Sequence, residues 1–266
     1  MADDTIPAAT VLLLRDEPVF EVLMVERHAD IGFAGGALVF PGGRIDPGDR
    51  NPAWTEHSAG APARPGESRD PGMIAAEVAA IREAFEETGI LIAREAGASD
   101  APLLGGARAK ALHDWRAVVE ADDAQFLEMV RREGLSLACD RLCLFAHWIA
   151  PPGLHRRFDT LFFAAACPPG QAARADGNEA TEALWISPHQ AAAARARGER
   201  KIIFPTLCNL RLLGESGSAS EVFAFARERR IEAVQPTIET RDGAAWLTIP
   251  DGLGYPVTEE RLDASL

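Results

Sequence analysis

The residues most suggestive of chemistry are three closely spaced glutamates, Glu83, Glu86 and Glu87. On an α-helix they fall within about 100° of one another and therefore share one face. Carboxylates this close repel one another unless their charge is compensated, and a hard divalent cation such as Mg²⁺ or Mn²⁺ prefers oxygen ligands of this kind. Such a cation could bridge the carboxylates and a diphosphate, polarise phosphorus and lower the pKa of a bound water. The bland alternative is a solvated acidic helix face, which is common.

The helix that must carry these glutamates is predicted from Met73 to Glu87. Arg82 lies four residues before Glu86, within reach of an ion pair, and can also orient Glu83 through a tertiary contact. Gly89 stands at a C-cap position, where a left-handed backbone conformation ends many helices. The apolar positions fall opposite the acids and can enter a core: Ile74, Val78, Ile81 and Phe85.

Short apolar runs separated by turn residues predict the strands around this helix. Val11-Leu14 and Phe20-Val25 form a predicted hairpin, and Ala37-Phe40 is a third strand, which Pro41-Gly42-Gly43 ends. The remaining predicted elements are strands at 142–149, 160–165 and 183–186, helical segments at 107–132, 188–198, 205–213 and 220–229, the last beginning at Ser220, and a hairpin at 237–249.

A single α+β domain over residues 1–266 is the predicted organisation, because no internal repeat or long linker divides the chain. Within it we expect an irregular insertion at 46–72, rich in Pro, Gly, Asp and Arg. A helical insertion is expected at 105–135, and C-terminal helices with a hairpin at 200–266. The first insertion could close over a long substrate, form a dimer contact or be a mobile loop.

The composition limits the class of partner. The chain has 47% hydrophobic and 25% charged residues, which is ordinary for a soluble globular protein. Its net charge of −13 disfavours a nucleic-acid binder, which needs a basic surface. A bound cation and a few arginines can still reverse the sign inside a cleft. No apolar run is long enough to span a membrane. We therefore expect a small-molecule substrate, with no nucleic acid and no membrane.

The cysteines and chain ends bear on the compartment. No CxxC pair or zinc ligand set is present among the four cysteines, and a disulfide framework is not expected in a chain of this size. The first residues lack a signal-peptide pattern, and the last three are not Ser-Lys-Leu. We expect a cytoplasmic protein.

Three arginines are candidates for binding phosphate oxygens of a substrate. Arg27 ends the second predicted strand, close in sequence to the Gly42-Gly43 turn. Arg156 and Arg157 follow Pro151-Pro152-Gly153, and adjacent guanidiniums offer forked donors that suit a diphosphate. For Arg156 and Arg157, a basic surface turn is the competing interpretation.

Two separated segments resemble the signature of the Nudix hydrolases, whose second half reads REUxEExGU with U aliphatic. The segments are Pro41-Gly42-Gly43 and Arg82-Glu83-Ala84-Phe85-Glu86-Glu87-Thr88-Gly89-Ile90. The first half departs from the family spacing. The stretch before Arg82 is about 25 residues longer, and Asp49 stands at the usual offset of a glutamate after Gly43. That glutamate is therefore replaced by Asp49, supplied by Glu67, or absent.

Such an extended box is similar to the coenzyme A diphosphatase branch of the family, from peroxisomes, mitochondria and bacteria. The resemblance runs from about Ala8 to about Pro250 and includes 39–43, 112–116, 148–152 and 156–163. It implies a Nudix fold, with a mixed β-sheet sandwiched between α-helices. It also implies hydrolysis of coenzyme A or acyl-CoA to 3′,5′-ADP and (acyl-)phosphopantetheine, and it is compatible with a homodimer.

The resemblance also implies roles for individual residues. The implied metal ligands for Mg²⁺ or Mn²⁺ are three carboxylates and one backbone carbonyl, those of Glu83, Glu86, Glu87 and Gly42. Arg82 would orient Glu83. The catalytic base in this family is a glutamate of the box or one in a later loop. Asp176, Glu179 and Glu182 are the later candidates here, and Glu179 is preferred.

Three other functions remain as alternatives. The substrate could be ADP-ribose, NADH or a similar nucleoside diphosphate derivative. The chain could also be a non-catalytic, nucleotide-sensing Nudix-like module, although such a module has no need for all three glutamates. A decapping-type, nucleic-acid processing hydrolase fits poorly with the acidic charge.

Overall fold

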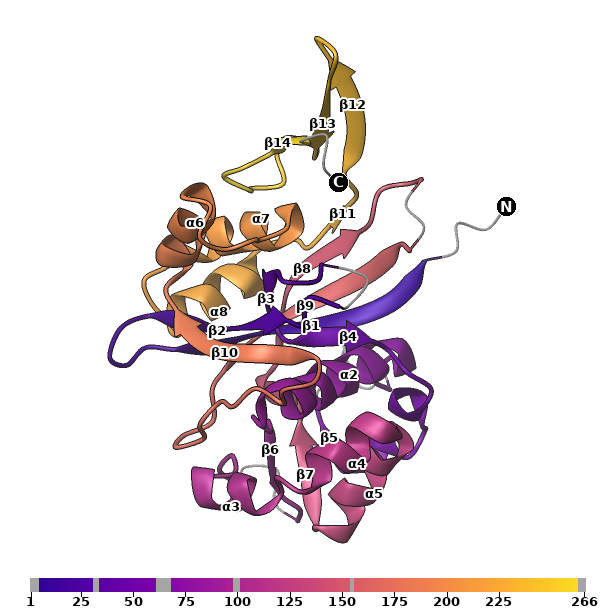
Figure 1. Ribbon diagram of the computed structural model, residues 1–266. Coiled ribbons are helices and arrows are strands. Elements are labelled where there is room, and N and C mark those ends of the chain that lie inside the picture. The colour runs from indigo at the N-terminus through magenta and orange to yellow at the C-terminus, as the bar shows by residue number, and fades with distance from the viewer. Residues whose placement is uncertain (1–4, 31–33, 61–67, 98–100, 154–155, 263–266) are drawn as a thin grey trace.

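A mixed eight-stranded sheet lies between two layers of helices (Figure 1). The computed structural model describes residues 5–30, 34–60, 68–97, 101–153 and 156–262. Each face of the sheet carries its own cluster of buried apolar side chains, so the chain has a core on both sides. This arrangement confirms the predicted α+β sandwich.

Strand β1 (Ile6–Arg15) lies inside the sheet and positions the rest. It pairs antiparallel with β2 (Glu21–Arg27), which confirms the predicted hairpin, and parallel with β9 (Phe158–Ala166). Its run of apolar residues is buried on both faces, as expected for an internal strand. The path through the sheet is β10 (Ala180–Ile186), β2, β1, β9, β8 (Cys143–Ile149) and β11 (Ala233–Val234), with β3 (Leu38–Val39) beside β2 and β4 (Gly42–Arg44) beside β1.

Helix α2 (Pro71–Thr88) covers one face of the sheet. Asp70 caps it by accepting a hydrogen bond from the Met73 amide, and a proline suits its first turn. Gly89 ends it in the left-handed conformation, with φ of 75°. A side chain at Gly89 would also collide with His113, since its Cβ would lie 2.7 Å from the His113 Nε2. The predicted helix and its glycine stop are both confirmed.

The other face carries α6 (Pro188–Ala196), α7 (Phe204–Leu213) and α8 (Ala219–Glu228) (Figure 1). Ser187 and Gln190 form a capping box at the start of α6. The predicted start of α8 at Ser220 is wrong by one residue, because the helix begins at Ala219 and Ser218 is its N-cap. Ser218 has the extended backbone of an N-cap, and its Oγ accepts a hydrogen bond from the Glu221 amide at 3.3 Å.

The two insertions pack against each other below α2 in the view of Figure 1. The described part of 46–72 is more regular than predicted, with η1 (Gly48–Arg50), α1 (Trp54–His57) and β5 (Ser58–Ala59). The second insertion holds α3 (Gly106–Ala111), α4 (Trp115–Ala121), α5 (Ala124–Arg132) and β7 (Leu135–Ala138). Strand β7 pairs with both β5 and β6 (Ala93–Glu95), so a small sheet joins the two insertions.

A three-stranded sheet near the C-terminus projects away from the main body (Figure 1). Strands β12 (Thr237–Arg241) and β13 (Ala244–Thr248) confirm the predicted hairpin, and β14 (Glu259–Leu262) extends it. Arg195 of α6 pairs with Glu260 at 2.6 Å and ties this sheet to the helical layer. In the described part of the chain, no helix is both long and apolar enough to cross a membrane.

An aromatic cluster links both insertions to α2. Phe126 of α5 lies 5.5 Å from the ring of Trp54 and 6.3 Å from that of Phe85. All three rings are fully buried. Phe85 lies between Glu83 and Glu86 in the sequence. The cluster therefore packs against the same turn of α2 that carries the acids.

We expect Phe126→Ala to lower the free energy of unfolding by about 3–4 kcal/mol, because it leaves a cavity between two aromatic rings. Val118→Ala is the control, since Val118 belongs to the neighbouring helix and its side chain is 44% exposed. Chemical denaturation of both variants measures the effect. A loss below about 1 kcal/mol for Phe126→Ala would show that the insertions do not depend on this cluster.

Candidate active site

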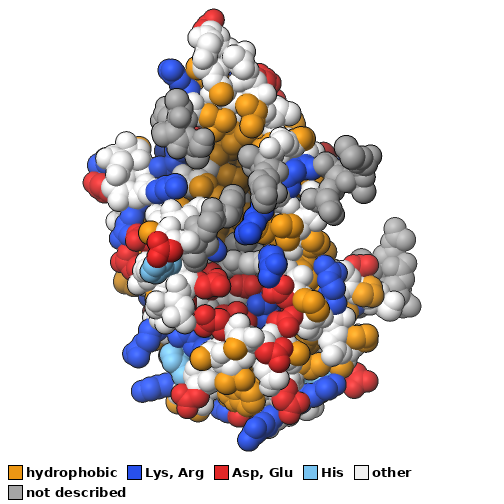
Figure 2. All heavy atoms as spheres, turned by 45° about the vertical axis from the view of Figure 1, so that its right-hand side comes forward, with side chains coloured by type: hydrophobic (Ala, Val, Ile, Leu, Met, Phe, Trp, Pro, Cys, Tyr) orange, Lys and Arg blue, Asp and Glu red, His pale blue; other side chains and the backbone are white. Residues whose placement is uncertain are grey.

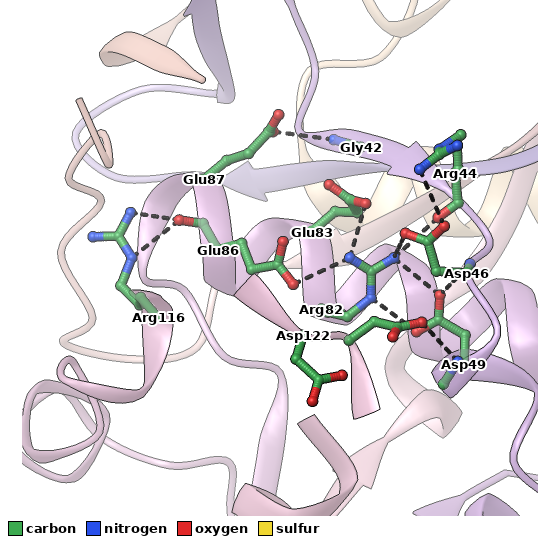
Figure 3. Close-up of polar contacts among 12 residues, drawn as sticks. Gly42, Arg44, Asp46, Asp49, Arg82, Glu83, Glu86, Glu87, Arg116 and Asp122 are labelled. Carbon is green, nitrogen blue, oxygen red and sulfur yellow. Dashed lines mark hydrogen bonds and ion pairs between the residues drawn. The ribbon is translucent and has the colours of Figure 1, made fainter. Parts of the chain in front are cut away.

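The centre of the candidate site is the buried guanidinium of Arg82, which is 2% exposed. Two of its nitrogens bind Asp49, with Nε to Oδ1 and Nη2 to Oδ2 both at 2.9 Å. Its Nη2 also donates to the Arg44 carbonyl at 3.0 Å (Figure 3). Forked pairing of this kind fixes the plane of a guanidinium as well as its position.

Asp49, a candidate for the glutamate position after Gly43, is therefore the residue that pairs with Arg82. The other candidate, Glu67, lies outside the described residues. Asp49 is held in turn by the Asp46 amide, which donates to its Oδ2 at 2.8 Å. The Asp123 carboxylate accepts from the Gly48 amide at 2.7 Å, so the second insertion supports the turn that carries Asp49.

The remaining nitrogen of Arg82 faces two glutamates of its own helix. Nη1 lies 3.0 Å from Glu83 Oε1 and 3.1 Å from Glu86 Oε1 (Figure 3). The predicted i, i+4 contact with Glu86 and the contact with Glu83 are thus both present. One arginine, fixed from behind by Asp49, sets the orientation of two carboxylates.

Glu87 lies on the other side of the cluster, beside the Gly42 turn. The Gly42 amide donates to its Oε2 at 3.2 Å, and Arg27 Nη1 lies 3.9 Å from its Oε1. The Arg27 Nε is buried and has no hydrogen-bond partner among the residues that the structure describes. Arg27 and Gly42 are therefore both brought to the acids, as predicted from the sequence.

The second glycine of the turn allows β4 to approach α2 closely. A Cβ at Gly43 would lie 2.4 Å from Glu83 Oε1 and 2.6 Å from its carboxyl carbon. No side chain fits there unless Glu83 moves. The glycine pair thus gives the backbone of β4 direct access to the carboxylates, which explains its place in the motif.

Glu179 approaches the cluster from a loop before β10. Asp176 shapes this loop, because its Oδ1 accepts from the Asn178 and Glu179 amides and its Oδ2 from the Ala180 amide. The His28 amide also donates to the Glu179 carbonyl at 2.8 Å. The negative charge of Glu179 contributes to the raised pKa values of Glu83, Glu86 and Glu87, so its carboxylate is near enough to act on all three.

Burial and mutual repulsion make these carboxylates hard to ionise together. Burial raises the pKa of Glu83 to about 8, assisted by the charges of Glu86 and Asp49, although Arg82 opposes the shift. Burial likewise raises the pKa of Glu86 to about 7. The pKa of Glu87 is also well above its usual value, because of burial and then the charge of Glu83. Figure 2 shows the acidic side chains gathered on this face, with basic side chains beside them.

The donor set fits a divalent cation by charge and chemistry. Arg82 contributes one positive charge to a cluster in which it contacts the carboxylates of Asp46, Asp49, Glu83 and Glu86. Within the described residues, however, no three His, Cys, Asp or Glu side chains already converge on one point as a metal site would require. Glu83 and Glu86 turn toward Arg82, while Glu87 turns toward Gly42. The three carboxylates are close together but point in different directions, so they would have to turn toward a bound cation.

The other two predicted arginines lie in the turn that precedes β9. Arg157 is buried, and its Nε donates to the Ala150 and Pro151 carbonyls, so its guanidinium holds the turn before β9. Arg156 is exposed in the same turn. Sequence reasoning missed Asp46, Arg44 and Arg116, whose contacts run through long-range ion pairs and backbone carbonyls. No local pattern marks such contacts.

The raised pKa values predict that the metal-free protein loses stability as pH rises. Glu83 and Glu86 bind more protons in the folded chain than in the unfolded chain between their ordinary pKa, near 4.5, and about 8. Stability must then fall with pH over that range. We expect the melting temperature in EDTA to drop by several degrees between pH 6 and pH 9.

The control is Glu83→Gln/Glu86→Gln, which removes both titrating groups and should flatten the pH dependence. Mn²⁺ or Mg²⁺ should restore the wild-type melting temperature at pH 9 and have little effect on the variant. Equal pH dependence in the two proteins would show that the cluster does not titrate in this way.

Known proteins are similar to this chain in sequence and in fold. The family model described as NUDT19 Nudix domain matches residues 57–213. The acyl-coenzyme A diphosphatase NUDT19 of Gallus gallus is 29% identical over 279 residues, covering 89% of this chain and 73% of that protein. The Homo sapiens protein of the same name is 27% identical, covering 88% of this chain and 72% of its own length.

A solved structure agrees with the fold. The crystal structure of a NUDIX hydrolase from Alicyclobacillus acidocaldarius is 29% identical and covers 84% of this chain and 97% of that one, with a TM-score of 0.68. The family model covers more than half of the chain and includes the whole of α2. Together with the Arg82 cluster and the paired glycines, these matches show that the chain is a Nudix hydrolase of the NUDT19 Nudix domain family.

Proposed function

We propose that this Nudix hydrolase cleaves the diphosphate of coenzyme A or acyl-CoA, giving 3′,5′-ADP and (acyl-)phosphopantetheine. The observation that carries the proposal is the buried cluster of Glu83, Glu86 and Glu87 around Arg82. The choice of substrate is supported by relatives that carry the name acyl-coenzyme A diphosphatase and match about nine-tenths of the chain.

Nudix hydrolases generally use divalent metal ions, and Mg²⁺ or Mn²⁺ is the proposed cofactor here. The residues that would hold it are the three glutamates of α2 and the Gly42 carbonyl: Glu83, Glu86, Glu87 and Gly42. When bound, the cation would neutralise charge on phosphoryl oxygens and make water more acidic. Arg82 stays outside this ligand set, since a guanidinium has no acceptor atom to offer a cation. Its nitrogens instead contact Asp49, Arg44, Glu83 and Glu86.

Glu179 is the proposed general base. It lies on a loop at the edge of the cluster, is exposed, and its charge acts on all three glutamates of α2. In the reaction, the oxygen of a water molecule forms a bond to one phosphorus, and the bridging P–O bond breaks. Glu179 accepts the proton that the water loses.

Arg27 is the proposed anchor for the diphosphate. Its guanidinium is close to Glu87, and its buried Nε has no partner in the described part of the chain, so it retains donor capacity inside the site. A phosphate oxygen would satisfy that donor and balance the charge of the arginine. Arg44 is a second candidate, because its side chain is 64% exposed and adjoins Asp46 at the rim of the cluster.

A cytoplasmic location is proposed as well. All four cysteines are free, as thiols remain in a reducing compartment. Burial raises the pKa of Cys139 to about 12 and that of Cys167 to about 11, so both are poor nucleophiles. Cell fractionation would contradict this location if the native chain were recovered from an oxidising compartment.

The substrate proposal is tested by incubating the protein with coenzyme A, acyl-CoAs, ADP-ribose and NADH in the presence of Mg²⁺ or Mn²⁺. We expect cleavage of coenzyme A or acyl-CoA, with mass spectrometry identifying 3′,5′-ADP and the matching phosphopantetheine. Glu86→Gln and Glu87→Gln should each lower kcat by about 10²-fold or more, because each removes a charge that holds the cation.

The control is Glu228→Gln, which changes an exposed glutamate at the end of α8 and should keep wild-type activity. Preference for ADP-ribose or NADH would replace the proposed substrate. Thermal stabilisation by these nucleotides without any turnover would indicate a sensing module instead. Full activity in both Glu86→Gln and Glu87→Gln would disprove the assignment of the site.

A further inference from the structure

Helix α4 of the second insertion reaches the candidate active site through a buried arginine. Arg116 is 8% exposed, and its guanidinium binds two backbone carbonyls from different segments. Its Nε and Nη2 donate to the Glu86 carbonyl at 3.1 and 2.7 Å (Figure 3). Its Nη2 also donates to the Arg174 carbonyl at 3.0 Å.

The first of these segments is the end of the helix that carries the acids. The last carbonyls of a helix lack partners within it and carry partial negative charge, so a guanidinium is favourable there. Capping α2 would require contact with Glu86 alone. The additional bond to Arg174 shows that Arg116 joins the helix to a second segment.

That second segment leads directly to Glu179. The Arg174 amide donates to the Thr88 carbonyl at 2.8 Å, so the segment runs beside the end of α2. Two residues later Asp176 begins the turn that presents Glu179. Helix α4 contacts this turn as well, because Asn178 Nδ2 donates to Glu120 Oε1 at 3.3 Å.

We propose that Arg116 is a positioning residue, which fixes the Glu179 loop relative to Glu86 so that the general base faces the acids of α2. The inference rests on the proposed function, in which Glu179 takes the proton from water. It gives the second insertion a part in the reaction without any contact with substrate. An arginine suits this part, because its planar fork holds two carbonyls at once, whereas a lysine offers a single point charge.

A double-mutant cycle tests the proposal, with kcat and KM measured on the best substrate of the wild-type enzyme. Arg116→Ala should lower kcat by about 10²-fold with KM changed less than about threefold, since a misplacement of about 1 Å is enough for such a loss. Arg116→Lys keeps the charge and should lose about tenfold. In a Glu179→Gln background, Arg116→Ala should cause little further loss, because the two changes remove one function.

Arg108→Ala is the matched control from the same insertion. Arg108 caps the end of α5 through the Glu133 carbonyl at 2.8 Å and pairs with Glu95 and Glu133, and these partners all lie away from α2. Its loss should destabilise the insertion and leave kcat of the folded enzyme unchanged. An equal fall in kcat for Arg108→Ala would show that general loosening of the insertion explains the effect.

The outcomes separate the two proposals. Multiplicative losses for Arg116→Ala and Glu179→Gln would overturn the positioning role and leave the proposed function intact. Full activity of Glu179→Gln would overturn the assignment of the base and the positioning role together. If Arg116→Ala does not fold, the same cycle with Arg116→Lys decides, since that variant retains a cation at the end of α2.

Discussion

The pairing of Arg82 with Asp49 is the interaction on which the candidate site depends. Both side chains are almost fully buried, and a buried charge without a partner is costly. The two forked hydrogen bonds satisfy that requirement and leave Arg82 with one nitrogen directed at Glu83 and Glu86. The orientation of the acids therefore follows from a contact made behind them.

That contact explains what the insertions do. Asp49 belongs to the first insertion, and the turn that carries it is held by Asp123 of the second. The aromatic cluster of Trp54, Phe85 and Phe126 packs both insertions under the acidic part of α2. The described parts of the insertions thus support the site from below, whereas the sequence alone left a substrate lid, a dimer contact and a mobile loop as equal possibilities.

The local features of the site could be predicted from the sequence, because they follow from periodicity and turn chemistry. The helix, its Gly89 stop and the shared face of the glutamates are of this kind, and so is the β1–β2 hairpin. The parallel pairing of β1 with β9 joins segments about 150 residues apart in the sequence, and no local pattern specifies it. The deep burial of Glu83 and Glu87 was also not predictable, because β4 and the loops that cover them come from elsewhere in the chain.

The pairing of Asp49 with Arg82 depends on both the local sequence and the fold. The offset from Gly43 made Asp49 one of two candidate residues, and only the fold brings its carboxylate to Arg82. Arg116 illustrates the opposite case, since its partners are backbone carbonyls, which exist at every position and leave no trace in the sequence. Ser218 was missed in favour of Ser220 for a simpler reason, because both serines lie within two residues of the start of the same helix.

We infer that Arg82, fixed by Asp49, holds a buried cluster of acids ready for a divalent cation. Anomalous diffraction from crystals grown with Mn²⁺ tests it most directly, because the ion is located independently of the protein atoms. We predict a peak in contact with the carboxylates of Glu83, Glu86 and Glu87 and with the Gly42 carbonyl, while the Arg82–Asp49 pair stays intact. A peak elsewhere, or a bound ion that displaces Arg82 from Asp49, would contradict the account.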